Sequence, residues 1–474
     1  MKTLLFTLLS LALASFPARA SGLEVETTAE MWPVWERLAA AHPLPPGFEA
    51  IRVGSGAPRS GDRLVMSVGE IAGGRAVDRI ALAPVGQLRD LGTAASLEDI
   101  RAGRFRVQPL ESITLPDIAL PVGDMYPDQA GYPLFTDVSL ALQGGNPALQ
   151  AWLNSLPPPA PPAPPAIAWV GAVGDLMPAR GVDAVLLRAG GARRVFGDTL
   201  PILGAAQLLL GNLEAAATSE GTAERKTFRF RFDPAALGPL KAAGFGYLSV
   251  ANNHSFDYGA TGFLDTLEAL SRWGIGTSGA GRDEQEAEQA FVTRYGSTEI
   301  RVLSFGAYPV DRTGFDGRKT ARAGAGRSGT LWLDDAGLES AARAFPRRSF
   351  NIALVHGGEE WSPRPVPEQR RLYRELIRAG ADVVIGSHPH VLQGLEAFEG
   401  GLICYSLGNF LFPGMEGTRG GQDSLILEFG IVQGKLRCVR LFPVRLEGTT
   451  VRLSPGQGVL ERMRGLTRDL DRGG

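Results

Sequence analysis

Two histidines, separated by one proline, follow a short apolar run late in the sequence. Residues 382–390 read Asp-Val-Val-Ile-Gly-Ser-His-Pro-His. On extended backbone the side chains at positions i and i+2 point to the same side, and Pro389 keeps His388 out of the α region. The spacing therefore predicts that His388 and His390 present two imidazoles side by side, as ligands for one transition metal or for two adjacent metals.

Four earlier places in the chain show the same arrangement, in which an apolar run ends in a carboxylate, a carboxamide or an imidazole. The runs are 168–173, 206–210, 247–251 and 351–355, and the polar residues after them are Asp175, Glu214, Asn253, His254 and His356. All-apolar runs of this length are typical of strands in a sheet that is covered on both faces. Of the five histidines in the chain, only His42 lies elsewhere. We interpret these residues as the rim of one active site.

The segments between these runs predict the architecture that positions them. From residue 167 onward, strand-like runs alternate with expected helices at 233–243, 262–273, 334–344 and 367–379. Near the C-terminus, Val432-Gln433-Gly434 separates the runs 425–431 and 435–441 and predicts a hairpin, followed by a short strand at 449–453. Such alternation predicts an α/β domain with the sheet inside and with ligand-binding residues on the loops after the strands.

The composition limits the function classes without naming one. A chain of 474 residues holds two or three domains, and 44% hydrophobic residues are ordinary for a globular protein. The net charge of −2 provides no bulk attraction to nucleic acid or to anionic lipid. The two cysteines, Cys404 and Cys438, lie in strand-like runs and could form a disulfide or remain buried thiols.

The N-terminus has the pattern of a secretory signal peptide. A lysine at position 2 precedes an apolar run at 4–16, and the residues Ala18-Arg19-Ala20 match a cleavage site. The run is too short to form a stable membrane-spanning helix. We therefore predict cleavage after Ala20 and an exported protein, periplasmic or extracellular; an uncleaved anchor is the alternative.

We predict four segments: a signal peptide at 1–20, a small α/β domain at 21–156, a Pro-rich linker at 157–166 and the main domain at 167–474. The proline-rich residues 157–165 favour a polyproline II spacer. In the small domain, helices are expected at 31–41 and after the caps Ser96 and Asn146, and strands at 63–68 and 78–84. Residues 132–135 and 146–149 resemble one lobe of phosphate-type periplasmic solute-binding proteins; a helper lobe for the main domain is the alternative.

Six blocks in the main domain resemble the bacterial capsule-synthesis CapA family, also called poly-γ-glutamate synthesis proteins. They are Gly174-Asp175-Leu176-Met177, Asn212-Leu213-Glu214, residues 251–254, residues 356–360, residues 386–393 and residues 405–410. Their order matches the family, and the resemblance spans residues 169 to about 412. Gly357 and Trp361 depart from it, because the family usually has Trp and Tyr at these positions.

The CapA family in turn resembles the calcineurin-like metallophosphoesterases, which implies a four-layer α/β/β/α sandwich. The resemblance implies that Asp175 and His390 hold one divalent metal, and that Asn253, His356 and His388 hold a second. Glu214 would bridge the two, and His254 would be the general acid or orient a phosphate. One or two ions of Mn, Fe or Zn are expected, and an activated water would attack phosphorus or a similar centre. Met177 departs from the phosphoesterase pattern, which has a histidine ligand there; a thioether is a poor ligand for hard divalent ions.

Three further features have a functional and a structural interpretation. Arg180 could bind an anionic group or lie on a helix surface. Glu360 could accept a hydrogen bond from a ligand imidazole or be an exposed loop acid. Residues 225–232 alternate cations and phenylalanines; we interpret them as an edge strand with an apolar inner face, rather than as a nucleic-acid-binding strand.

The sequence thus predicts an exported metal-dependent hydrolase that acts on an anionic cell-envelope polymer or its precursor. The family implies poly-γ-glutamate or a capsular polysaccharide as substrate, and a polymer synthase complex at the membrane as a further partner. Nucleic acid is not an expected partner. The alternative is a non-catalytic polymer-binding or export factor that retains the fold.

Overall fold

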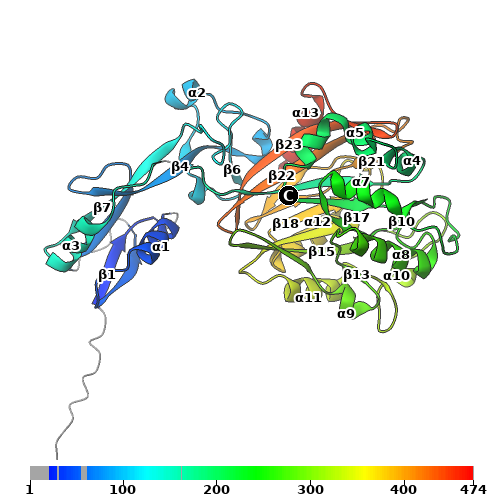
Figure 1. Cartoon of the computed structure of the whole chain (residues 1–474), viewed down its shortest axis with the longest axis horizontal. Helices are drawn as coiled ribbons and strands as arrows, with labels where there is room; N and C mark the ends of the chain where they lie inside the picture. Colours follow the sequence, from blue (N-terminus) through cyan, green and yellow to red (C-terminus); the bar gives the residue numbers. More distant parts are fainter. Residues whose placement is uncertain (1–20, 29–30, 55–60, 162, 473–474) are drawn as a thin grey trace, which may run out of the picture. The chain divides into compact units, whose positions relative to one another are not determined.

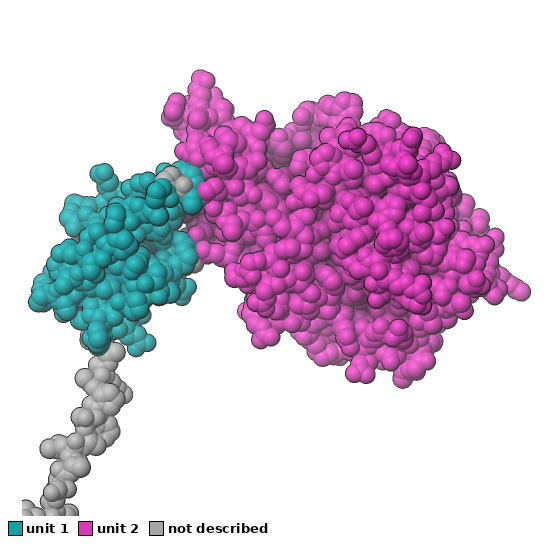
Figure 2. Space-filling model, viewed as in Figure 1, with its two compact units in different colours: residues 1–81, 134–163 teal, residues 82–133, 164–474 magenta. Residues whose placement is uncertain are grey.

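The computed structural model describes residues 21–28, 31–54, 61–161 and 163–472. The predicted signal peptide at 1–20 lies outside these residues. The chain divides into a smaller unit, Met1–Ala81 with Leu134–Ala163, and a larger unit, Leu82–Pro133 with Pro164–Gly474 (Figure 2). Within the described ranges, no helix has the length and apolar character needed to cross a membrane.

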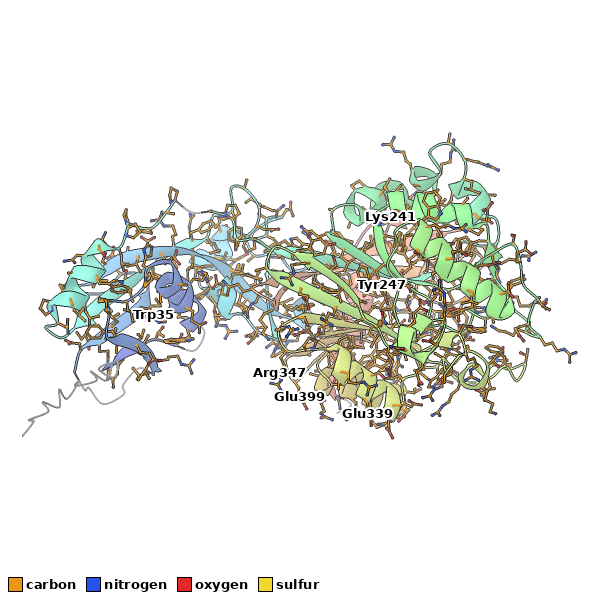
Figure 3. The ribbon with its side chains drawn as sticks, turned by 60° about the horizontal axis from the view of Figure 1, so that its bottom comes forward. Trp35, Lys241, Tyr247, Glu339, Arg347 and Glu399 are labelled. Atoms are coloured by element: carbon orange, nitrogen blue, oxygen red, sulfur yellow. The ribbon has the colours of Figure 1, made fainter. Side chains whose placement is uncertain are left out.

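The smaller unit is a mixed sheet covered by two helices. Its strands are β1 (Ser21–Glu26), β2 (Phe48–Val53), β3 (Arg63–Val68), β7 (Phe135–Gln143) and the first half of β4 (Arg75–Gln87). Its helices are α1 (Trp32–Ala41) and α3 (Pro147–Ser155). The buried Trp35 (Figure 3) packs against Trp152 with ring centroids 6.2 Å apart. The Asn146 side chain accepts hydrogen bonds from the first turn of α3, as predicted for a helix cap.

Residues 82–133 belong to the larger unit, although the sequence suggested one domain over 21–156. The second half of β4 pairs with β5 (Val107–Pro109) and β6 (Asp117–Ala119), and β6 pairs with β23. The physical reason is burial, since Leu88, Leu91, Ile118 and Leu120 are part of the larger unit's core. This segment also contains η1 (Leu88–Asp90), α2 (Leu97–Arg101), which Ser96 caps, and η2 (Leu110–Ser112).

Two sheets form the centre of the larger unit (Figure 1). The first contains, in order, β12 (Phe245–Ser249), β9 (Leu208–Leu213), β8 (Ala168–Leu176), β22 (Asp423–Val432) and β23 (Lys435–Glu447), with β21 (Asn409–Leu411) beside β8 and β24 (Thr450–Leu453) beside β23. The second contains, in order, β14 (Phe291–Tyr295), β15 (Thr298–Ala307), β17 (Phe350–Gly357), β18 (Val383–Ser387), β20 (Gly401–Cys404) and β19 (Leu395–Phe398). Neighbours among β8, β9 and β12 are parallel, and so are neighbours among β15, β17 and β18.

Apolar side chains fill the space between the two sheets and on their outer faces. Val170 and Leu210 of the first sheet share one core cluster with Ile352 and Val383 of the second. Tyr247 (Figure 3) links the sheets, because its hydroxyl lies 2.6 Å from Ser304 Oγ. Strands covered on both faces explain the all-apolar runs in the sequence and confirm a mixed α/β class.

Helices cover the outer faces of both sheets. The first sheet packs against α4 (Val182–Leu186), α5 (Gly191–Phe196), α6 (Leu200–Leu203), α7 (Leu237–Ala242) and α8 (Gly259–Arg272). The second packs against α11 (Asp335–Ala344) and α12 (Pro367–Arg378). The remaining elements are α9 (Glu284–Ala287), α10 (Gly317–Thr320), η3 (Gly197–Thr199), η4 (Pro234–Ala236), β10 (Ala216–Ala217), β11 (Arg231–Phe232), β13 (Ala280–Gly281) and β16 (Gly329–Thr330).

The C-terminal segment contains one predicted and one unpredicted element. The hairpin between β22 and β23 turns at Gln433 and Gly434, whose φ angles of 51° and 70° suit a two-residue turn. Helix α13 (Gly458–Arg472) was not predicted. It buries Val459, Leu460 and Met463 in the core between the sheets, so its amphipathic pattern has a structural role.

Two sequence expectations are corrected by the structure. Residues 225–230 form no strand, and only Arg231–Phe232 (β11) pairs, with β10. Lys226 is buried whereas Phe228 is 60% exposed, which is the reverse of the predicted inner apolar face. Cys404 and Cys438 are free, buried thiols on strands of different sheets.

Candidate metal centre

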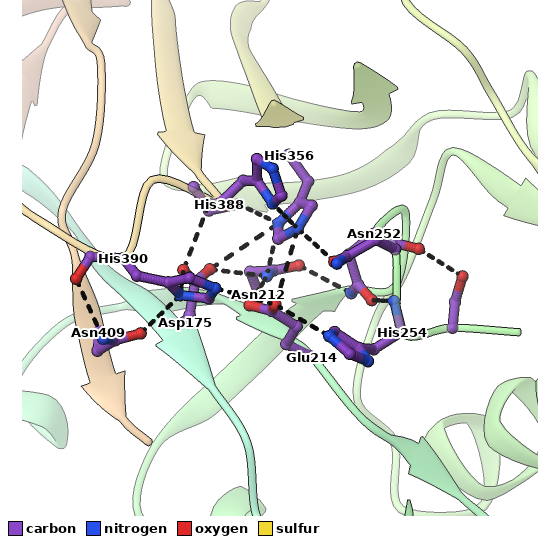
Figure 4. Close-up of polar contacts among 12 residues, drawn as sticks. Asp175, Asn212, Glu214, Asn252, His254, His356, His388, His390 and Asn409 are labelled. Atoms are coloured by element: carbon purple, nitrogen blue, oxygen red, sulfur yellow. Dashed lines mark hydrogen bonds and ion pairs between the residues drawn. The ribbon is translucent and has the colours of Figure 1, made fainter. Parts of the chain in front are cut away.

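The predicted ligands come together at the carboxyl ends of strands from both sheets (Figure 4). Asp175 lies at the end of β8, Glu214 follows β9, and His356 lies near the end of β17. Two glycines allow this convergence. A Cβ at Gly174 would lie 1.9 Å from the Gly408 carbonyl oxygen, and one at Gly386 would lie 2.0 Å from that of Tyr405. Any larger residue at either position would push a ligand-bearing strand end away from the site.

The backbone around the histidine pair differs from the extended form that the sequence predicted. The φ angles are 95° at His388 and 58° at His390, both in the left-handed region. Pro389 disfavours the α region for His388, but that does not make it extended. The backbone N–H of His388 lies 3.3 Å from Asp175 Oδ2, which anchors this turn to the first sheet. The two rings still enter the same site, with centroids 6.1 Å apart.

Glu214 lies at the centre of the cluster. Its Oε1 is 3.7 Å from His390 Nε2, 3.8 Å from His356 Nε2 and 3.9 Å from His254 Nε2. These separations exceed hydrogen-bond length. Ligand atoms of Asp175, Glu214 and His356 all lie within 4.8 Å of one another, so these three residues could hold one ion.

The other predicted ligands surround the same point. Asn253 Oδ1 is 2.8 Å from His356 Nε2, and His388 Nδ1 is 3.2 Å from the same nitrogen. His390 Nδ1 is 3.3 Å from Asp175 Oδ2. The structure therefore brings all six predicted metal ligands together, while their roles as ligands stay predictions.

Four polar residues that were not predicted as site residues orient these ligands. Asn212 Nδ2 donates to Asp175 Oδ1 at 2.8 Å, and Asn252 Nδ2 in turn donates to Asn212 Oδ1 at 3.0 Å. Asn409 Oδ1 accepts from His390 Nδ1 at 2.9 Å, and Ser387 Oγ lies 2.9 Å from His356 Nδ1. All four lie in or directly beside the sequence blocks quoted above, so their position along the chain was a usable signal. Partners of this kind fix the orientation of metal-binding side chains.

Burial controls the protonation of the site. It raises the pKa of Glu214 well above its usual value, and the nearby Asp175 carboxylate adds to the effect. Burial also lowers the pKa of His388 to about 3 and that of His356 well below its usual value. For His390, burial acts in the same direction, but Asp175, Glu360 and Asn409 together outweigh it and raise the pKa. Neutral imidazoles are the form that binds metals.

Two atoms at the centre of the site test whether a cation fits. Glu214 Oε1 and His388 Nε2 are buried and have no hydrogen-bond partner among the described residues. Buried polar atoms without partners are costly, and a shared cation would satisfy both. Carboxylate oxygens and neutral imidazole nitrogens are suitable ligands for Zn, Mn and Fe ions. The residues present therefore fit one or two divalent metals.

His254 is held by a buried charged group that the sequence analysis did not identify. Its Nδ1–H donates to Asp257 Oδ2 at 2.6 Å, which leaves Nε2 on the side of Glu214. Asp257 also forms an ion pair with Lys226, and the Lys226 ammonium donates to the Asn253 carbonyl oxygen at 2.6 Å. The side chains of Lys226 and Asp257 are 3% and 0% exposed. Lys226 therefore fixes the loop that carries both Asn253 and His254.

The remaining predicted site residues lie at the edge of the cluster or outside it. Arg180 is exposed, donates to the Pro413 carbonyl oxygen at 2.7 Å and contacts none of the six ligands. Glu360 is exposed, and the His356, His390 and His254 Nδ1 atoms have other partners, so the structure does not support Glu360 as their acceptor. Met177 is fully buried in the apolar core under the helices of the first sheet.

Comparison with known proteins places this site in a family context. Residues 170–414, just over half of the chain, match the family model described as bacterial capsule synthesis protein PGA_cap, and this range contains every residue of the cluster. The capsule biosynthesis protein CapA of Bacillus anthracis is 29% identical over 311 residues, which cover 64% of this chain and 73% of that protein. The PGA biosynthesis protein CapA of Bacillus subtilis (strain 168) is 28% identical over 281 residues, 59% of this chain and 71% of that protein. A hypothetical protein from Thermus thermophilus with a solved crystal structure shares 16% identity and a TM-score of 0.38, over 59% of this chain and 100% of that chain, and this score is too low to support an argument.

Proposed function

Because this chain belongs to the bacterial capsule synthesis protein family PGA_cap, we propose that it is an exported, metal-dependent hydrolase acting on an anionic cell-envelope polymer or its precursor. One observation carries the proposal. Glu214 Oε1 is buried without a hydrogen-bond partner among the described residues, and the Nε2 atoms of three histidines surround it at 3.7–3.9 Å. A shared cation explains why a carboxylate and three imidazoles lie buried at that spacing.

We also infer that residues 167–474 form the four-layer α/β/β/α sandwich of the metallophosphoesterases. The support is the pair of packed sheets, with a shared core between them and helices on both outer faces. In that arrangement, the carboxyl ends of parallel strands from both sheets meet at one edge, where ligand sites usually lie.

The chain's own residues divide the work of the proposed reaction. Asp175 and His390 would hold one ion, and Asn253, His356 and His388 a second, with Glu214 between them. When bound, divalent ions supply an activated water and polarise a phosphoryl or similar group.

Proton transfer falls to His254 in this proposal. Its Nδ1 proton is held by Asp257, so Nε2 is the nitrogen that can exchange a proton with a substrate. Burial lowers the pKa of His254, although Asp257 opposes this effect. The imidazole is therefore poised to accept a proton at neutral pH and to return it to a leaving group.

Metal content tests the proposal directly. We expect the purified protein to contain one or two equivalents of a transition metal by mass spectrometry, and the His388→Ala/His390→Ala double variant to contain far less. His42→Ala is the matched control, since His42 belongs to the smaller unit, and it should retain the metal. Equal, near-zero metal in all three proteins would overturn the proposal.

Catalysis is tested separately with model phosphomonoesters and phosphodiesters in the presence of Mn, Zn, Fe or Co. Met177 lies in the apolar core and leaves the first ion one ligand short of the phosphoesterase pattern. A metal-loaded protein that hydrolyses none of these substrates would favour the alternative, a polymer-binding or export factor. Mass analysis of the mature protein from its native cell tests export, because cleavage after Ala20 gives Ser21 as the first residue.

A further inference from the structure

A continuous row of rings passes along the metal cluster. It consists of Phe228, Phe230, Phe412, His390 and Trp361, and we call it the ring row. Its successive centroids are 6.5, 5.8, 4.9 and 5.2 Å apart. The two end members are exposed, Phe228 by 60% and Trp361 by 38%, whereas Phe230, Phe412 and His390 are buried. A ligand lying on the two end rings would therefore cross the site.

The inner members of the ring row contact the groups that carry the proposed chemistry. The Phe230 ring packs on His254 with centroids 4.4 Å apart, and its backbone N–H donates to Asp257 Oδ2 at 2.7 Å. His390 belongs to the predicted ligand set. The exposed ends and the reacting centre are thus parts of one rigid surface.

Two residues beside the ring row have strained backbones. Trp361 has a φ of 66° and Arg180 a φ of 53°. A positive φ is uncommon for residues other than glycine and is energetically unfavourable. Both are held by specific contacts, because the Trp361 N–H donates to the Pro389 carbonyl oxygen at 2.9 Å and the Arg180 guanidinium to that of Pro413 at 2.7 Å. Strain of this kind concentrates at ligand sites.

The two ends of the ring row carry opposite charge. At the Phe228 end, the Arg180 guanidinium lies 6.0 Å from the Phe228 centroid and 4.9 Å from that of Phe230. Arg229, next in sequence to Phe228, is also exposed. At the Trp361 end, the neighbouring Glu359 and Glu360 are exposed carboxylates, and Glu360 is close enough to influence the pKa of His390. A chain with a carboxylate on every residue would be repelled at this acidic end.

The chemistry of the two ends identifies a class of ligand. Aromatic faces are electron-rich and attract the polarised C–H groups on the flat side of a sugar ring. A carboxylate such as Glu360 accepts hydrogen bonds from hydroxyls, and an arginine binds an anionic substituent. Poly-γ-glutamate has neither rings nor hydroxyls. An acidic sugar polymer satisfies all three groups together.

We propose that the ring row is the binding platform for an acidic glycan, with pyranose rings stacked on Phe228 and Trp361, hydroxyls bonded to Glu360 and an anionic substituent at Arg180. This assignment rests on the proposed function, since it takes the cluster beside the ring row as the reaction centre. It selects a polysaccharide over a polyglutamate as the polymer that the site receives.

The test measures binding of three probes by isothermal titration calorimetry: tetragalacturonate, a hyaluronan octasaccharide and a γ-linked glutamate octamer. We expect at least one acidic oligosaccharide to bind more tightly than the glutamate octamer. Phe228→Ala and Trp361→Ala should each weaken its binding about tenfold, the upper range for one aromatic contact. Trp361→Phe keeps a stacking face and should restore most of the affinity. Trp273→Ala is the matched control, because Trp273 is 43% exposed on the larger unit and lies outside the ring row.

Three results would overturn the inference. They are failure of both oligosaccharides to bind, unchanged affinity in both alanine variants, and an equal loss of affinity for the glutamate octamer. Each titration is repeated after metal removal with EDTA, which separates this inference from the proposed function. Aromatic-dependent binding by a protein that never holds metal would preserve the glycan platform and remove the hydrolase, and a metal-loaded protein without aromatic dependence would do the reverse.

Discussion

Two regions of the larger unit concentrate ionisable groups, and they handle charge in opposite ways. On the outer face of α12, a surface hollow of about 430 Å³ is lined by Arg370, Arg371, Arg374, Glu375 and Arg378. Arg370 and Arg374 both pair with Glu396. Burial opposes ionisation of Glu396, but the hydrogen bonds from Arg374, Tyr405 and Arg370 outweigh it and lower its pKa.

In the metal centre, by contrast, burial raises the pKa of Glu214, and Asp175 raises it further. The α12 face provides its own counter-charges within the chain, whereas the centre leaves Glu214 Oε1 and His388 Nε2 without partners among the described residues. The difference shows that a dense group of charges indicates a ligand site only where the chain fails to neutralise it. The α12 face is therefore structural, and the centre calls for a cation from outside.

The largest expected effect comes from Lys226, the ammonium that balances Asp257 beside the centre. Lys226→Met leaves the fully buried Asp257 carboxylate without a cation, and breaking a buried pair in this way costs about 3–5 kcal/mol. Urea denaturation should show this loss in the free energy of unfolding. Lys241→Met is the control, because Lys241 is exposed and donates only to the Gly274 carbonyl oxygen. A loss below about 1 kcal/mol for Lys226→Met would show that water replaces the ammonium and that the loop is not fixed by this pair.

The next effect is the stabilisation of the protein by metal and its dependence on pH. A ligand at 100 times its Kd adds about 2.7 kcal/mol to the free energy of unfolding. In the metal-free protein, His388 has a pKa of about 3 against an ordinary value of 6.5. As the pH falls below about 6.5, the unfolded chain therefore gains protons that the folded chain does not, and stability is lost progressively toward pH 3.

Glu214 acts in the opposite direction, because its pKa in the folded protein is raised. Above about pH 4.3 the unfolded chain has released this proton while the folded chain retains it, so the metal-free protein loses stability as the pH rises. A bound cation displaces that proton and requires neutral imidazoles, so the gain on adding Mn or Zn should be largest near pH 7.5 and shrink toward pH 5. Thermal denaturation at both pH values measures it, with His388→Ala/His390→Ala as the control. A gain that is independent of pH would contradict binding at these side chains.

The sequence was sufficient where the signal was local and repeated. The apolar runs ending in Asp175, Glu214 and His356 predicted strand ends, and parallel pairing brings such ends to one edge. The backbone at His388 and His390 was not predictable in this way, since a turn anchored on Asp175 from another sheet sets it. Local periodicity contains no information about such a distant anchor.

Tertiary partners also explain the other differences. Residues 225–230 have the alternation of a strand, but Lys226 finds a buried carboxylate 31 positions later, and the ion pair overrides the local preference. Residues 82–133 look like part of the first domain, yet Ile118 and Leu120 complete the core of the larger unit. In both cases the deciding contact joins residues that no sequence window contains together.

The smallest expected effect tests the α12 face and so completes the comparison. Arg378 pairs with Glu399, and the two side chains are 47% and 51% exposed. Solvent screens such a pair, so Arg378→Ala should change the free energy of unfolding by about 0.2–1 kcal/mol, and the change should shrink in high salt. Glu399→Ala should give a similar value, because each substitution removes the same pair. If Arg378→Ala instead left stability unchanged but abolished binding of an acidic oligosaccharide, the α12 arginines would be serving an external anion despite their internal partners, and charge neutralisation within the chain would no longer distinguish a structural face from a ligand site.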